Sequence, residues 1–153
     1  MLMVVNAGSS SIKLAVFDAG LAQVMSASVT EIGGAGRLVV GAVAQDCAVA
    51  DHRAALGLAL EGLGVAVADL TAAAHRVVHG GAGLVQPARV TAAVIAGIEA
   101  CVPLAPLHNP ANLTAIRALQ DLAPDLPQFV SFDTAFHASN PAVAVTYALP
   151  LAE

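Results

Sequence analysis

The 153-residue sequence has few charged side chains and almost no aromatic ones. Charged residues make up 11% of the chain, Lys13 is its one lysine, and the net charge is −5. There is no tryptophan and one tyrosine. Without a basic cluster for phosphates or aromatic rings for base stacking, nucleic acid is excluded as a partner. The low number of charged residues also indicates that part of the protein surface is normally covered by another surface.

Long uninterrupted hydrophobic runs are missing as well. Glu61, Asp69, Glu99 and several prolines break the apolar stretches before they reach the length of a membrane span. No basic segment precedes the apolar N-terminal run, which argues against a signal peptide. The two cysteines, Cys47 and Cys101, have no metal-ligand spacing and are typical of reduced thiols. We therefore expect a cytoplasmic protein without a membrane partner, about one domain in length.

The hydrophobic pattern changes along the chain from strand-like to helix-like. An apolar strand over 2–5 precedes alternating runs over 11–18, 23–32 and 37–45, which predict an antiparallel meander. Helices are expected over 51–63, 91–102 and 109–123, with strands over 72–79 and 128–133. Asp51, Thr91 and Asn109 are the expected N-caps, and Pro110 suits a first helical position. The pattern predicts a mixed α/β sheet with helices packed against it.

A small, hydroxyl-rich turn lies between the first two strands, with the sequence Asn6-Ala7-Gly8-Ser9-Ser10-Ser11. Glycine and serine let backbone N–H groups converge on an anion without side chains in the way. The hydroxyls and the Lys13 ammonium add further donors. The turn is either a phosphate-binding loop or an ordinary hairpin, and the nearby Lys13 favours phosphate.

Arg76 follows a buried run in the segment 74–81, beside two histidines. Its planar fork of donors matches a carboxylate or a phosphate, although a structural ion pair is the simpler interpretation. Both flanking histidines, His75 and His79, are interpreted as structural.

Two further polar residues lie at the expected ends of elements. His108 precedes a helix N-terminus, where it either donates to a phosphoryl oxygen or orders the loop. Asp133 ends a predicted strand, where ligands collect in open α/β sheets. Its carboxylate either serves chemistry or caps the next turn.

In their order along the chain and in their amino-acid sequences, the four segments resemble one family, the acetate kinases with the related short-chain acyl kinases. The resemblance rests on residues 5–13, 75–81, 105–110 and 132–137, and 147–150 also fits. It covers nearly the whole chain. It implies an α/β fold of the actin, sugar-kinase and Hsp70 type (ribonuclease H-like), in which two domains close on a nucleotide.

The same resemblance implies a reaction, ATP plus acetate giving ADP plus acetyl phosphate, reversibly and with Mg²⁺. It assigns Asn6 to the magnesium site, Lys13 to ATP, Ser9 and Ser11 to the phosphates, Arg76 to the acyl substrate, His108 to the phosphoryl region and Asp133 to the catalytic aspartate. Acetate is already ionised at neutral pH and needs little base catalysis. We therefore expect Asp133 to position groups and order the metal rather than carry a proton.

The sequence departs from the family at its end, because acetate kinases continue beyond the point matching Glu153 into a second domain. The expectation is an N-terminal domain over residues 1–153, inactive alone, whose family homodimer forms only at full length. A bare face made to meet that second domain accounts for the low surface charge. Alternatives are a butyrate or propionate kinase domain, a non-catalytic binding module, or a plain structural domain.

Overall fold

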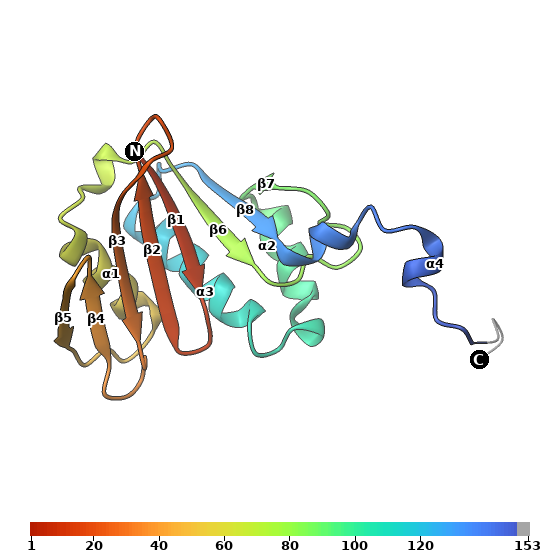
Figure 1. Cartoon of the computed structure of the whole chain (residues 1–153), viewed down its shortest axis with the longest axis horizontal. Helices are drawn as coiled ribbons and strands as arrows, with labels where there is room; N and C mark the ends of the chain where they lie inside the picture. Colours follow the sequence, from red (N-terminus) through yellow and green to blue (C-terminus); the bar gives the residue numbers. More distant parts are fainter. Residues whose placement is uncertain (150–153) are drawn as a thin grey trace.

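One mixed sheet of eight strands organises the chain, of which the computed structural model describes residues 1–149 (Figure 1). The strands are β1 (Leu2–Ala7), β2 (Ser11–Phe17), β3 (Gln23–Thr30), β4 (Arg37–Val40), β5 (Val43–Asp46), β6 (Ala72–Val77), β7 (Ala88–Arg89) and β8 (Gln128–Phe132). Their order across the sheet is β5-β4-β3-β2-β1-β6-β8-β7. Strands β1 to β5 form the predicted antiparallel meander, while β6 and β8 run parallel to β1.

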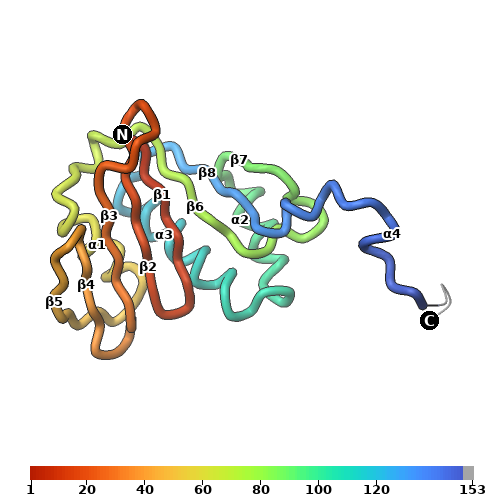
Figure 2. The backbone as a smooth tube through the Cα atoms, viewed as in Figure 1, coloured from red at the N-terminus to blue at the C-terminus, as the bar shows by residue number. Residues whose placement is uncertain are grey.

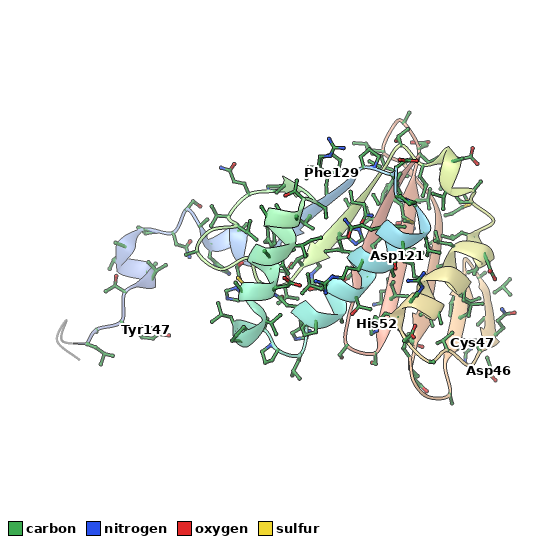
Figure 3. The ribbon with its side chains drawn as sticks, turned by 180° about the vertical axis from the view of Figure 1, so that it is seen from behind. Asp46, Cys47, His52, Asp121, Phe129 and Tyr147 are labelled. Atoms are coloured by element: carbon green, nitrogen blue, oxygen red, sulfur yellow. The ribbon has the colours of Figure 1, made fainter. Side chains whose placement is uncertain are left out.

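Three helices cover one face of this sheet. They are α1 (His52–Leu63), α2 (Ala92–Ala100) and α3 (Asn109–Leu122), and the view from behind shows them in front of the strands (Figure 3). A short helix, α4 (Ala142–Val145), belongs to an exposed C-terminal segment that leads away from the sheet (Figure 2). Within residues 1–149, no helix covers the opposite face, which we call the open face (Figure 1). None of the described helices is long and apolar enough to cross a membrane.

Buried and exposed residues alternate along the strands because helices cover only one face of the sheet. In β1, Met3, Val5 and Ala7 are buried against the helices, while Leu2 and Val4 are exposed on the open face. The core has two neighbouring parts. One joins β1 to β4 with α1 and α3, and the other joins β6 and β8 with α2 and α3. Helix α3 contributes to both parts and therefore ties the meander to the parallel strands.

Several predicted boundaries are wrong. The run 37–45 is two strands, because a turn at Gly41, whose φ is +56°, folds it into a hairpin. Helix α2 ends at Ala100, and Val102 begins a short 3-10 turn. His108, rather than Asn109, is the N-cap of α3, although its side chain does not cap the helix. Strand β6 ends at Val77, so the predicted last two residues of that strand lie beyond it.

Asp51 and Thr91 are N-caps, as predicted.

Candidate active site at the carboxyl edge of the sheet

The parallel strands β1, β6 and β8 end side by side, at the edge where ligands collect in open α/β sheets. Asn6 of β1 pairs with Arg76 of β6, and Arg76 pairs with Ser131 of β8. Because side chains of directly paired residues point to the same face, these three share the open face. Asp133 comes directly after β8. The register therefore brings together residues that are distant in the sequence.

Arg76 joins two of these strand ends through its guanidinium. Its Nε and Nη2 donate to the two carboxylate oxygens of Asp133, at 2.9 and 2.5 Å, in a two-pronged pair. Its Nη1 donates to the Asn6 Oδ1 at 3.1 Å. We call Asn6, Arg76 and Asp133 the Arg76 cluster. The side chains of Arg76 and Asp133 are 47% and 39% exposed, so a solute can reach the pair.

A row of polar residues extends the Arg76 cluster across the open face. Lys13 of β2 lies opposite Asn6, and Ser28 of β3 lies opposite Lys13. Lys13 is exposed and borders a hollow that it lines with Asn6 and Ser28. The side chains of this row add an ammonium, a hydroxyl and an amide to the guanidinium. Ser28 gave no signal in the sequence, because only the strand register brings it beside Lys13.

The turn between β1 and β2 lies at the same edge and is tightly built. Gly8 N–H donates to the Ser11 carbonyl at 2.8 Å, and a Cβ at Gly8 would lie 3.2 Å from the Ser11 Oγ. His52, at the start of α1, forms a hydrogen bond with the turn: its Nε2 lies 2.6 Å from the Gly8 carbonyl oxygen. Ser9 is exposed at the tip of the turn. The N–H of Gly8 is used within the turn, so the proposed binding of phosphate by Ser9 and Ser11 stays a prediction.

Two buried asparagines of α3 lie behind the strand ends, and sequence reasoning missed both. Asn112 donates from Nδ2 to the Ala7 carbonyl at 2.6 Å and accepts from Val78 N–H at 3.2 Å. Asn109 accepts from His79 N–H at 3.2 Å and donates to the His79 carbonyl at 3.0 Å. The available signal was their position on the apolar face of a helix, where a polar side chain needs partners.

The two neighbouring histidines each form a hydrogen bond within the protein, which supports the interpretation of both as structural. His75 is buried on the helix-covered face, where its Nε2 lies 2.8 Å from the Gln128 Oε1. Burial lowers the pKa of His75 to about 4, since the protein interior disfavours the charged imidazole, and the Gln128 hydrogen bond opposes this shift. His79 accepts from Gly81 N–H through its Nδ1. His75 is therefore neutral at physiological pH.

His108 lies outside the Arg76 cluster. It is exposed at the N-terminus of α3, and its backbone N–H donates to Ala105. The next residue, Asn109, is anchored at the segment after β6, so His108 belongs to the same general edge of the sheet. Its predicted contact with a phosphoryl oxygen stays a prediction.

Magnesium is the metal that the resemblance implies. Among residues 1–149, no three histidine, cysteine, aspartate or glutamate side chains form a cluster that could hold a metal ion. The Arg76 cluster nevertheless contains three oxygen atoms of a kind that binds metals, one from Asn6 and two from Asp133, each of which accepts a hydrogen bond from Arg76. Mg²⁺ commonly binds through one or two protein oxygens, with substrate phosphates and waters completing its shell. The donor chemistry therefore fits a magnesium ion that is shared with a phosphate.

Comparison with protein families gives a match over residues 1–153, to the model of the acetokinase family. The chain belongs to the acetokinase family. Among its curated relatives are an acetate kinase of Streptomyces avermitilis, 44% identical over 97% of this chain, and one of Deinococcus deserti, 41% identical over 98%. In both cases the chain spans 40% of the relative's length.

Solved structures of acetokinase-type enzymes have the same fold. The acetate kinase of Porphyromonas gingivalis matches 99% of this chain with a TM-score of 0.93 and 32% identity, over 41% of its own length. A propionate kinase of Francisella tularensis subsp. tularensis matches 98% with a TM-score of 0.90 and 31% identity, also over 41% of its length. These matches confirm the predicted family and its α/β fold of the actin and sugar-kinase type.

Proposed function

We propose that the chain supplies the acyl-side part of an acetate kinase, which transfers a phosphoryl group reversibly between ATP and acetate. The observation that carries this proposal is the Arg76 cluster, a half-exposed guanidinium held at the carboxyl edge of the sheet by Asp133 and Asn6. Family membership and the acetate kinases among the relatives support it. Because the chain spans 40% of those relatives, we expect a second domain to complete the site and negligible turnover without it.

In the proposed reaction, an acetate oxygen attacks the γ-phosphorus of ATP and the bond to ADP breaks. The main obstacle is bringing two anions together, since acetate is already a nucleophilic carboxylate. Asp133 holds the guanidinium of Arg76 in one orientation through both carboxylate oxygens. The N–H groups of Nη1 and Nη2 that Asp133 and Asn6 do not use are proposed to receive a carboxylate or an acyl phosphate. Asp133 therefore acts through Arg76 and the metal, and does not need to carry a proton.

The remaining donors are proposed for the nucleotide side. Lys13 and Arg76 lie on the same row, with Asn6 of β1 between them, so the Lys13 ammonium is proposed to offset phosphate charge on the other side of Asn6 from the guanidinium. Ser9 and Ser11 belong to the turn beside it, and His108 is proposed to donate to the phosphoryl group. Asn6 and Asp133 would hold Mg²⁺, which would supply further charge neutralisation. Cytoplasmic location and a homodimer formed only at full length complete the proposal.

A second candidate function is that of a propionate kinase, which differs from an acetate kinase in the length of the acyl chain it phosphorylates. The propionate kinase matches the fold almost as well as the acetate kinase does, with TM-scores of 0.90 and 0.93. One methylene group changes binding by only about 1–3 kcal/mol. Acetate is favoured because the two curated relatives described above, at 44% and 41% identity, are acetate kinases. Comparing acetate with propionate as acceptor decides between them.

A complementation assay tests the proposed function. The purified chain is mixed with the separately produced remainder of the Streptomyces avermitilis acetate kinase, and acetyl phosphate is trapped as hydroxamate. We expect activity from the mixture, little from either part, and almost none with Arg76→Ala. Arg53→Ala is the matched control, since Arg53 forms an exposed ion pair with Asp121. A mixture with full activity despite Arg76→Ala contradicts the proposal, as does rapid turnover by the chain alone.

A further inference from the structure

The amide of Asn112 lies directly behind the Arg76 cluster and is engaged at both ends. The residue is 2% exposed. Its Nδ2 donates to the Ala7 carbonyl at the end of β1, and its Oδ1 accepts from the Val78 N–H just after β6. Ala7 and Asn112 are 105 residues apart in the chain. One side chain of the helical layer therefore joins two strand ends of the sheet.

The position of this bridge in the strand register is its informative feature. The last paired residues of β1 and β6 are Asn6 and Arg76. Asn112 bonds to the backbone just beyond them, where a continuing parallel ladder would use a direct bond between the strands. The inserted amide thus ends the ladder and replaces its next rung. Directly before it, the side chains of Asn6 and Arg76 meet on the open face, 3.1 Å apart.

A neighbouring contact makes the attachment of α3 firmer. Asn109, which is completely buried, bonds both backbone groups of His79. Side chains of α3 therefore form hydrogen bonds to Val78 and His79 in succession, whereas the Asn112 side chain bonds β1 at the Ala7 carbonyl alone. Loss of the Asn112 donor would remove the hydrogen-bonded link between Ala7 and the segment after β6, although strand pairing and the His52 bond to Gly8 would remain.

We infer that Asn112 is a positioning residue for phosphoryl transfer. Its amide fixes the turn 8–10 and Asn6 relative to Arg76, and so sets the spacing between the proposed phosphate-binding and acyl-binding sides of the site. The effect on substrate rests on the proposed function, while the effect on the Arg76 side chain does not. Asn112 touches no substrate in this role, since it acts from the helix-covered face.

Two variants and one matched control test this inference in the full chain. Asn112→Asp keeps an acceptor for Val78 N–H and cannot donate to Ala7 when ionised. Asn112→Ala removes both bonds without burying a charge. Thr114→Ala is the control, because Thr114 is exposed on the same helix and its hydroxyl bonds only the Pro110 carbonyl. Circular dichroism verifies that each variant folds.

Two NMR measurements on ¹⁵N-labelled chain provide the readouts. The first is hydrogen exchange at the Arg76 Nε–H, which reports the cluster without any ligand. The second is the affinity for acetyl phosphate. We expect each Asn112 variant to exchange at Arg76 about tenfold faster and to bind acetyl phosphate at least about tenfold more weakly, the effect of losing roughly one buried hydrogen bond. Thr114→Ala should match the original chain in both.

The possible outcomes are separable. A folded Asn112→Ala chain with unchanged exchange at Arg76 and unchanged affinity overturns the inference. If the original chain does not bind acetyl phosphate, the proposed function fails, and exchange at Arg76 alone decides the role of Asn112. If neither variant folds, native-state exchange in the original chain decides it: Val78 N–H and Arg76 Nε–H must open together, and independent opening overturns the inference.

Discussion

Arg76 is ion-paired and still accessible, which is what its proposed role in substrate binding requires. An exposed pair contributes little to stability, since water and salt screen it. The two-pronged contact with Asp133 therefore serves mainly to orient the guanidinium, and the third donor reaches Asn6. Three of the five N–H donors of the guanidinium are used in this way, so a carboxylate or phosphate that approaches from the open face meets the remaining N–H groups of Nη1 and Nη2.

Replacement of Arg76 by alanine should leave the fold intact. Because the side chain is half exposed, we expect the free energy of unfolding to change by less than about 1 kcal/mol. Urea denaturation of Arg76→Ala beside Arg53→Ala measures this. A much larger loss of stability for Arg76→Ala alone would mean that the pair is structural, as the simpler interpretation of the sequence holds.

His75 makes stability depend on pH. Its pKa is about 4 in the folded chain, below the ordinary value of 6.5, so the unfolded chain binds the proton more readily. The neutral imidazole stabilises the fold above pH 6.5, and this contribution is lost as the pH falls from 6.5 to 4. The difference corresponds to about 3 kcal/mol.

Urea denaturation between pH 7 and pH 4 measures this loss, with His75→Gln as the comparison. We expect the original chain to lose more stability over this interval than the variant does, because glutamine does not titrate. Equal slopes would show that His75 is not the group responsible.

At the scale of single residues, the sequence named three side chains that the structure brings into contact, but not the residues that hold them in place. Asn6, Arg76 and Asp133 were predicted, and the structure joins them by hydrogen bonds, while their chemical roles remain proposals. Asn112 and His52 were not predicted, because their partners are backbone carbonyls far along the chain. A side chain that bonds a distant main-chain atom leaves no local pattern in the sequence.

At the scale of elements, the connection after β6 depends on very close packing at Gly80. A Cβ there would lie 2.2 Å from the Leu84 carbonyl oxygen and 2.9 Å from the Phe132 ring. Gly80 N–H also donates to the Thr134 Oγ1 at 3.0 Å, which links the ends of β6 and β8. No side chain fits at this position without moving the Leu84 backbone and the Phe132 ring, which precedes Asp133.

Gly80→Ala should therefore destabilise the chain by at least about 2 kcal/mol, through overpacking against a backbone atom. Gly83→Ala is a matched control in the same loop, since an added Cβ there meets nothing within 4 Å. Thermal unfolding followed by circular dichroism compares the two. Equal midpoints for Gly80→Ala and the original chain would contradict the close packing.

The sequence predicted whether a segment is a helix or a strand where one hydrophobic periodicity continues through it. It did not predict where several of these helices and strands begin and end. The alternation over 11–18 and the capped helix over 51–63 are confirmed. The run 37–45 is two strands, since its alternation continues through a turn that only the positive φ of Gly41 reveals. The two-residue strand β7 was missed, because so short a strand exists only through its pairing with β8.

At the scale of the whole molecule, all three long helices lie on one side of the sheet (Figures 1 and 3). The open face therefore carries both the polar row at the carboxyl edge and an apolar groove at the other end of the same strands. The groove is lined by Leu2, Val4, Phe17, Leu21, Phe129 and neighbouring alanines. A contiguous apolar surface of this kind usually meets another surface.

The chain should accordingly bind an environment-sensitive apolar dye and associate at high concentration. Phe129→Ser, which removes an exposed ring from the groove, should weaken both. Leu107→Ser is the control, because Leu107 is exposed but lies outside the groove. Fluorescence titration and sedimentation measure the two effects. Equal dye binding by the original chain and both variants would argue against an apolar groove.

The central claim is that Arg76 differs from the other ion-paired arginines because it recognises an acyl phosphate. Arg53 and Arg117 provide internal controls, being exposed to a similar degree and paired with Asp121 and Glu99. Titration of arginine-labelled chain with acetyl phosphate, followed by NMR at each Nε–H, tests the claim most directly. We predict a saturable shift at Arg76 and none at Arg53 or Arg117. A uniform, non-saturating shift at all three, or no shift at Arg76, would contradict it.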